Sequence, residues 1–159
     1  VLHHDNGQGR DLLWAAAMLH ACGRHINMSS YHKHSWYLIR HGELLGYSDV
    51  EHLMIAAIAR YHRRSLPKKR HDSWQSFSKR EDRRLVAEMA MILRLAAALD
   101  RRPIPAVESI EIDSTLTEII FKLYPENEEN LSLEKWSLMN CSNILKEVYD
   151  LKMNVILPG

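Results

Sequence analysis

Four of the ten histidines in this 159-residue sequence occur where helices are expected to begin or end. They are His20, His32, His34 and His62. Neutral imidazole is a common ligand of Zn, Fe, Ni or Mn, and the ends of packed helices meet at the mouths of pockets. By residue type and position, these histidines are therefore candidate ligands of a metal-dependent enzyme.

The carboxylates that such an enzyme requires do not accompany these histidines. A hydrolytic site with two metal ions needs carboxylates that bridge the ions. His20 is followed by Ala21, and residues 95–99 hold no acid before Asp100. We therefore expect the histidines to be hydrogen-bonded polar residues or contacts to an anion, and we expect this chain to hold no metal and no other cofactor.

A second group of residues with chemical potential is a basic segment. Residues 60–84 hold ten Lys/Arg and three Asp/Glu, whereas residues 108–150 hold ten acids and three bases, so the net charge of +1 hides two opposed regions. Arginine binds phosphate oxygens in pairs, and lysine supplies a mobile point charge. The basic segment is either a site for a phosphate-rich polymer or a solvated face. The candidate polyanion-binding residues are Arg63, Arg64, Lys68, Lys69, Arg70 and His71.

Nucleic acid fits this segment less well than polyphosphate does. The aromatic residues near it are few, Trp74 and Phe77, and they do not alternate with basic residues as a base-stacking surface requires. The sequence also shows no helix-turn-helix spacing. The expected partner is therefore polyphosphate or a similar polyanion.

Hydrophobic periodicity indicates that these residues are carried by a helical body. The first helix has Gly23 as its C-terminal stop, and Ser48 with Glu51 forms a capping box for the third. We expect Trp14, Trp36 and Trp136 to lie in the core, because each falls on an apolar helical face. Helices are expected over residues 11–20, 31–45, 49–61 and 79–100.

The pattern changes after Pro103 and Pro105. Alternating residues predict strands over 107–112, 118–124 and 152–157, with one helix starting at Ser132 between the last two. The expected fold is therefore mainly α, with a helical domain over residues 1–105 and a small strand-strand-helix-strand unit over residues 106–159.

Composition excludes several classes of protein. No apolar run approaches the roughly 18 residues of a membrane-spanning helix, so we expect no membrane association. Two cysteines, Cys22 and Cys141, are too few for a disulfide framework or a four-thiolate zinc site. The first residues are not basic and then apolar, as in a signal peptide. The expected location is the cytoplasm.

Four ordered segments carry a specific resemblance to a known family. Together they resemble the C-terminal domain of the exopolyphosphatase/guanosine pentaphosphate phosphatase family, which belongs to the wider group of HD-type metal-dependent phosphohydrolases. The resemblance extends over essentially the whole chain. The segments are LLWAAAMLHACG (12–23), YHKHSWYLI (31–39), IARYHRRSLPK (58–68) and LRLAAALDR (93–101).

The resemblance implies an HD-like body over residues 1–105 in which the metal site is degenerate. HD enzymes carry a His-Asp pair where this chain has His20 and Ala21, and their last metal-binding aspartate corresponds to Ala97. His34 and His62 match the two middle histidines. A methyl group cannot bridge metal ions, so the resemblance implies that this chain holds no catalytic residue.

The resemblance also implies an accessory role in a longer hydrolase. In the family, exopolyphosphatase chemistry with Mg²⁺ or Mn²⁺ resides in N-terminal domains with Gly-rich phosphate loops, and this sequence has no such loop. The expected function is to bind polyphosphate or guanosine pentaphosphate, between which the sequence does not choose, and to form a homodimer. Two alternatives remain: an HD phosphohydrolase active by itself, with a carboxylate such as Asp100, and a pure dimerisation module.

Overall fold

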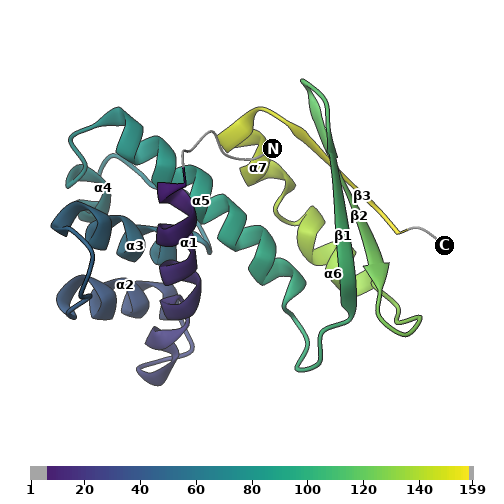
Figure 1. Cartoon of the computed structure of the whole chain (residues 1–159), viewed down its shortest axis with the longest axis horizontal. Helices are drawn as coiled ribbons and strands as arrows, with labels where there is room; N and C mark the ends of the chain where they lie inside the picture. The colour runs from purple at the N-terminus through teal and green to yellow at the C-terminus, as the bar shows by residue number, and fades with distance from the viewer. Residues whose placement is uncertain (1–6, 158–159) are drawn as a thin grey trace. The chain divides into compact units, whose positions relative to one another are not determined.

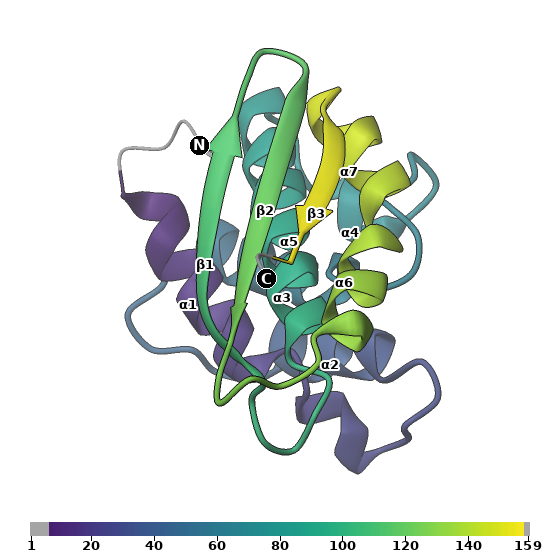
Figure 2. The same ribbon diagram turned by 90° about the vertical axis from the view of Figure 1, so that its right-hand side faces the viewer.

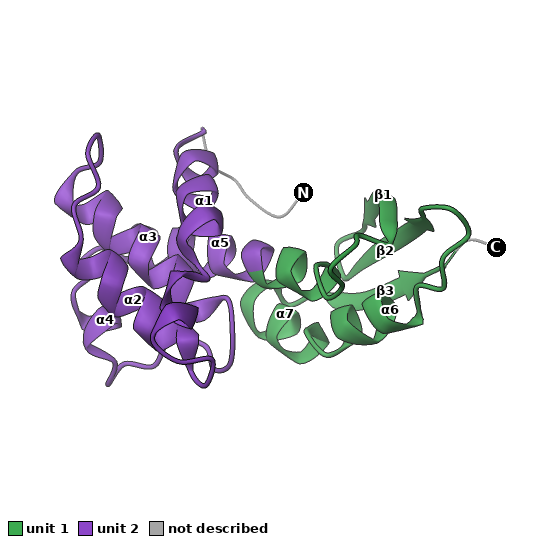
Figure 3. Cartoon of the chain, turned by 90° about the horizontal axis from the view of Figure 1, so that it is seen from below, with its two compact units in different colours: residues 1, 94–159 green, residues 2–93 purple. Residues whose placement is uncertain are grey.

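The computed structural model describes residues 7–157, which form a helical part followed by a small sheet with two further helices (Figure 1; Figure 2). The mainly α fold with a small α/β unit at its C-terminal end is confirmed. Contacts within the chain divide it into two compact units, an N-terminal unit up to Leu93 and a C-terminal unit from Arg94 (Figure 3). The predicted domain boundary after residue 105 stays a prediction.

The N-terminal unit is built around α3, which has eight buried residues. α1 and α2 both pack against α3 (Figure 1). The buried side chains of α3 are aliphatic apart from Tyr61, and three of them are alanines, so neighbouring helices approach it closely. The helices are α1 (Gln8–Leu19), the 3-10 helix η1 (Cys22–His25), α2 (Tyr31–His41), α3 (Asp49–Tyr61), α4 (Asp72–Gln75) and α5 (Arg80–Leu99), which continues into the C-terminal unit.

The start of α3 is fixed by the predicted capping box. The Glu51 amide donates to Ser48 Oγ at 3.4 Å, and the Ser48 amide donates to Glu51 Oε2 at 2.9 Å. These reciprocal bonds satisfy backbone donors that a helix start otherwise leaves free, so the capping-box prediction is confirmed.

Gly23 has a different role from the predicted helix stop. Its amide donates to Ser35 Oγ at 2.9 Å, and that hydroxyl donates to the His20 carbonyl at 2.6 Å. A Cβ atom on Gly23 would lie 2.3 Å from both the Ser35 nitrogen and the Tyr31 oxygen. Glycine is required here because η1 lies directly against the backbone of α2.

The C-terminal unit contains a three-stranded sheet in the order β1-β2-β3. β1 pairs with β2 antiparallel, and β2 pairs with β3 in parallel through a crossover made by α6 and α7, which pack against β3 (Figure 2). Two short helices stand where the sequence predicted one, because the chain turns at Asn140 and Cys141. The elements are β1 (Val107–Ser114), β2 (Glu118–Pro125), α6 (Ser132–Met139), α7 (Ser142–Tyr149) and β3 (Lys152–Ile156).

The core of this unit lies under β2 and β3, and β1 lies outside it. Ile119, Phe121 and Leu123 on one face of β2 are buried. Ile110 pairs with Leu123 on the same face, yet it remains 41% exposed. All residues of β1 after Val107 are exposed.

An ion pair anchors the segment before β1 to α6. The carboxylate of Glu134 is buried. Its Oε1 lies 2.8 Å from Arg102 Nε as an ion pair, and its Oε2 accepts a hydrogen bond from Arg102 Nη2 at 3.1 Å. Arg102 also donates to the Asn130 carbonyl at 2.6 Å. The ion pair and these two hydrogen bonds hold Arg102 against the start of α6.

Two of the three tryptophans predicted to be core are not. Trp14 is 65% exposed and Trp136 is 59% exposed, whereas Trp36 is half-buried and packs against the helical core. Within residues 7–157, no helix is both long and apolar enough to cross a membrane.

Candidate anion-binding site

The basic loop after α3 closes a pocket of about 240 Å³ in the N-terminal unit. The start of α2 and the end of α3 supply its other walls. Because the start of α2 meets the end of α3, residues about thirty positions apart in the sequence reach one hollow. The lining residues are His32, Lys33, Arg60, Tyr61, Arg63, Ser65, Lys68, Arg70 and His71.

The charged side chains of this lining are all basic. Five of the nine residues are lysine or arginine, and none is aspartate or glutamate. Positive groups that converge on a concave surface concentrate the field and attract anions. The pocket is therefore suited to a ligand with several negatively charged oxygens.

Aromatic rings hold two of the arginines in place. The guanidinium of Arg63 lies over the ring of Tyr31, 4.9 Å from its centroid. That of Arg60 lies 5.6 Å from the centroid of Trp36 and 5.7 Å from that of Tyr61. Cation–π contacts orient a guanidinium without neutralising its charge, so both arginines keep their attraction for an anion.

His71 is held in the rim of the pocket by hydrogen bonds. Its Nδ1 accepts from the Lys68 amide at 3.2 Å and lies 3.0 Å from the Tyr61 hydroxyl, which in turn lies 2.7 Å from Ser73 Oγ. The rings of Tyr61 and His71 stack. Burial, followed by the charge of Arg60, lowers the pKa of His71. The imidazole thus favours its neutral form while the pocket holds no anion.

His32 is the most unusual residue of the pocket. It is 5% exposed, and its Nδ1 has no hydrogen-bond partner among the residues that the structure describes. Burial, followed by the charges of Arg60 and Arg63, lowers the pKa of His32 to about 4. A neutral, buried imidazole with an unused nitrogen therefore lines a strongly basic hollow.

The structure brings together four of the six residues that the sequence proposed for polyanion binding. Arg63, Lys68, Arg70 and His71 line the pocket, whereas Arg64 and Lys69 belong to the same loop without lining it.

Five of the lining residues were not among the predicted polyanion-binding residues, although His32 was considered as a metal ligand and Arg60 belongs to the basic segment. They are His32, Lys33, Arg60, Tyr61 and Ser65. A signal for three of them was present, because two basic residues stand at the predicted start of one helix and a third stands at the predicted end of the next. Which helix ends meet depends on tertiary packing, and local sequence patterns do not specify it.

Two histidines of the degenerate metal positions are adjacent and already hydrogen-bonded. The rings of His20 and His62 lie edge to face, with centroids 5.0 Å apart. Each Nδ1 lies 2.6 Å from the backbone carbonyl three residues earlier, that of Ala17 or Ala59. His62 Nε2 also lies 3.2 Å from the Tyr31 hydroxyl.

The remaining positions add no metal ligand to this pair. Ala21 follows His20, His34 is half-buried on α2, and Ala97 belongs to the C-terminal unit. Over residues 7–157, no group of three or more His, Cys, Asp or Glu side chains is placed to hold a metal ion. The side chains of this region therefore do not fit a two-metal hydrolytic centre.

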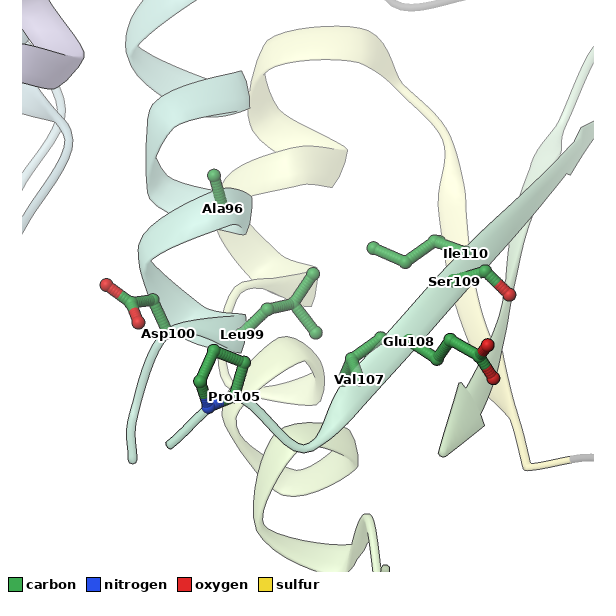
Figure 4. A pocket seen from close by; sticks show the side chains of 8 residues that line it. All are labelled: Ala96, Leu99, Asp100, Pro105, Val107, Glu108, Ser109 and Ile110. Atoms are coloured by element: carbon green, nitrogen blue, oxygen red, sulfur yellow. The ribbon is translucent and has the colours of Figure 1, made fainter. Parts of the chain in front are cut away.

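A larger hollow of about 380 Å³ lies in the C-terminal unit, between the end of α5 and β1 (Figure 4). Leu99, Val107 and Ile110 give it an apolar wall, and its acidic residues are Asp100 and Glu108. With carboxylates and no basic residue, this hollow is unsuited to phosphate. Asp100, the carboxylate considered for an active hydrolase, belongs here.

Comparison with known proteins assigns residues 2–148 to the Ppx/GppA phosphatase, domain III family. A guanosine-5'-triphosphate,3'-diphosphate pyrophosphatase of Pseudoalteromonas atlantica is 29% identical over 141 residues, which are 83% of this chain and 27% of the relative. The protein of that name from Pseudoalteromonas translucida is 45% identical over 65 residues, which are 41% of this chain and 13% of the relative. The chain thus matches only a minor part of each relative's length.

Proposed function

Because the chain belongs to the Ppx/GppA phosphatase domain III family, we propose that it is an accessory domain that binds the polyanionic substrate of a Ppx/GppA-type phosphatase. The observation that carries this proposal is the pocket with five lysines and arginines and no acid. The ligand class is polyphosphate or the phosphate groups of guanosine pentaphosphate.

The size and charge of the pocket support this ligand class. A hollow of about 240 Å³ accommodates one or two phosphoryl groups, and the remainder of a chain can follow the basic loop. Arg64 and Lys69 belong to that loop, outside the pocket lining. Binding of this kind releases counterions, so its affinity falls steeply as salt is added.

The state of the histidines supports the proposed accessory role. His20 and His62 donate their Nδ1 protons to backbone carbonyls, and among residues 7–157 no group of three or more His, Cys, Asp or Glu side chains is placed to hold a metal ion. Hydrolysis, with Mg²⁺ or Mn²⁺, is then performed by other parts of a cytoplasmic parent enzyme. We further propose that the HD-like body supports a homodimer.

The proposal is tested by titrating the chain with linear polyphosphate at low salt. We expect the variant Arg63→Ala/Lys68→Ala/Arg70→Ala to bind at least roughly tenfold more weakly, because each charged hydrogen bond contributes on the order of 1.5–3 kcal/mol. The matched control, Lys135→Ala/Lys146→Ala/Lys152→Ala, removes three exposed charges from the C-terminal unit and should bind almost normally. Equal losses in both variants would contradict a defined site.

Catalysis is tested separately. The chain incubated with polyphosphate and Mg²⁺ or Mn²⁺ is expected to release no phosphate. Metal-dependent release that survives further purification would overturn the accessory role.

A further inference from the structure

We propose that the basic pocket recognises the terminal phosphoryl group of a polyphosphate chain and that His32 shares a proton with it. This inference rests on the proposed function, since it requires that the pocket bind polyphosphate. It adds which part of the polymer enters the pocket and which residue selects it.

The position of His32 supplies the first argument. His32 is the second residue of α2, an eleven-residue helix whose first turn holds Lys33 and no acid. The start of a helix carries a partial positive charge and favours an anion. Since His32 and Lys33 both line the pocket, the helix start adds to the field of the basic side chains.

The unused nitrogen supplies the second argument. The residue is 5% exposed, and Nδ1 is buried with no partner among residues 7–157. A buried polar atom without a hydrogen-bond partner destabilises the folded state. A ligand atom in the pocket is the partner that removes this destabilisation.

The groups around His32 set its protonation. Lys33 on α2, Arg60 on α3, and Arg63 and Arg64 in the loop all oppose a positive charge on it. The ring of Tyr31 lies edge-on to it, with centroids 6.4 Å apart. Lys68, Arg70 and His71 complete the lining from the loop, so no carboxylate of the pocket offsets these charges. His32 is therefore neutral, and a neutral ring whose proton is on Nε2 leaves Nδ1 as an acceptor for a ligand hydroxyl.

Terminal and interior phosphoryl groups of polyphosphate differ in their acidity. An interior phosphoryl group is a strong acid that carries one negative charge and no proton. A terminal group has a second, weakly acidic hydroxyl, with a pKa near 6 in phosphate monoesters. Only the terminal group can therefore share a proton with Nδ1 while its other oxygens accept from the arginines and lysines. No bond to phosphorus forms or breaks.

The experiment compares two small phosphates of similar charge, linear tripolyphosphate and cyclic tetrametaphosphate, because the ring has no terminal group. Affinity and proton uptake are measured by titration calorimetry in buffers of different ionisation enthalpy, about one pH unit or more above the terminal pKa. We expect the linear compound to bind at least about tenfold more tightly and to take up a proton, since a shared proton must then come from the buffer.

His32→Asn is the informative variant, because its amide keeps a neutral polar group near the position of Nδ1 and cannot titrate. We expect it to bind the ring as the original chain does, to lose the preference for the linear compound, and to take up no more protons with the linear compound than with the ring. The matched control is His25→Asn, at an exposed histidine of η1, which should retain the preference.

The outcomes separate the two proposals. Equal affinity for the linear and cyclic compounds overturns terminal recognition and leaves the binding function standing. So does an excess of proton uptake with the linear compound over the cyclic one that persists in His32→Asn, because His71 can take up a proton with either compound. Failure of the original chain to bind either compound or longer polyphosphate overturns the proposed function and this inference with it.

Discussion

The Tyr31 hydroxyl lies 3.2 Å from Nε2 of His62, and both side chains are buried. Because the Ala59 carbonyl can only accept, the 2.6 Å contact places the proton of His62 on Nδ1. Nε2 is then the acceptor, and the tyrosine donates to it. This bond joins the first residue of α2 to the end of α3, directly behind the basic pocket.

Tyr31→Phe is expected to destabilise the chain by about 1–3 kcal/mol, because it removes this donor from a buried nitrogen. The ring, over which Arg63 lies, is retained. Urea denaturation followed by circular dichroism measures the difference. Tyr37→Phe, at a 56% exposed tyrosine of the same helix, should leave the midpoint unchanged, and equal midpoints for both variants would show that the bond contributes nothing.

Gly23→Ala is expected to cost roughly 1–3 kcal/mol or more, as overpacked substitutions do. The new methyl group would meet backbone atoms of α2 at 2.3 Å, and backbone cannot move aside as a flexible side chain can. Thermal unfolding measures the loss, with His25→Ala in the same 3-10 helix as control. A variant as stable as the original chain would mean that η1 does not lie against α2 in solution.

Glu134→Ala is expected to destabilise the chain by about 1–3 kcal/mol, because it breaks the ion pair of Arg102 with a carboxylate whose side chain is only 1% exposed. Lys122→Ala serves as comparison, since Lys122 Nζ lies 2.8 Å from Asp113 Oδ2 on the exposed face of the sheet. Ion pairs in water contribute little, so this variant should unfold almost as the original does. Similar losses in the two variants would contradict the contrast in burial.

His32 predicts a pH dependence of stability. The unfolded chain binds its proton at the ordinary pKa of 6.5, whereas the folded chain binds it only at about 4. Between these values the unfolded state holds more protons, so the free energy of unfolding falls as the pH falls through this window. The stabilisation that the neutral His32 provides is complete above pH 6.5 and is lost below about pH 4.

His32→Asn should remove this part of the pH dependence. Subtracting its free energies of unfolding from those of the original chain, across the window from 6.5 to about 4, isolates the histidine. The difference should reach roughly 2–3 kcal/mol, from about 1.4 kcal/mol per pKa unit. Parallel curves for the two proteins would show that His32 titrates normally in the folded state.

The two cysteines should differ in reactivity. Burial raises the pKa of the Cys141 thiol, and the side chain is 7% exposed, so thiolate is scarce and reagents have little access. Cys22 is half-buried. A thiol-reactive chromophore should label Cys22 in the folded protein and reach Cys141 only after denaturant is added. Cys141→Ala and Cys22→Ala variants assign each phase, and labelling of Cys141 at the rate of Cys22 would contradict its burial.

Local patterns predicted the elements well where one rule decided the outcome. The Ser48–Glu51 capping box and the alternation in β2 required no knowledge of distant residues. The exposure of Trp14 and Trp136 was not predictable, because an apolar helical face does not say whether another element covers it. The break between α6 and α7 likewise falls in a segment whose apolar spacing suits one continuous helix.

The site was predictable only as far as it is local. Lys68, Arg70 and His71 were found because charge density along the chain identifies the loop. His32 was predicted only as a candidate metal ligand. Its place beside Arg60 depends on how α2 meets α3, which no local pattern shows. Its lowered pKa arises from that packing, and no pattern within the first turn of α2 encodes it.

The exposed strand β1 has a consequence for how the chain behaves at high concentration. β1 is an edge strand of the described sheet, and Glu108, Glu111 and Asp113 lie exposed along it. An edge strand offers free backbone groups to any other strand, and a second copy of β1 would bring like charges together. The carboxylates therefore act against self-association and aggregation at neutral pH. Acidification removes that repulsion, so we expect copies of the chain to associate first through β1.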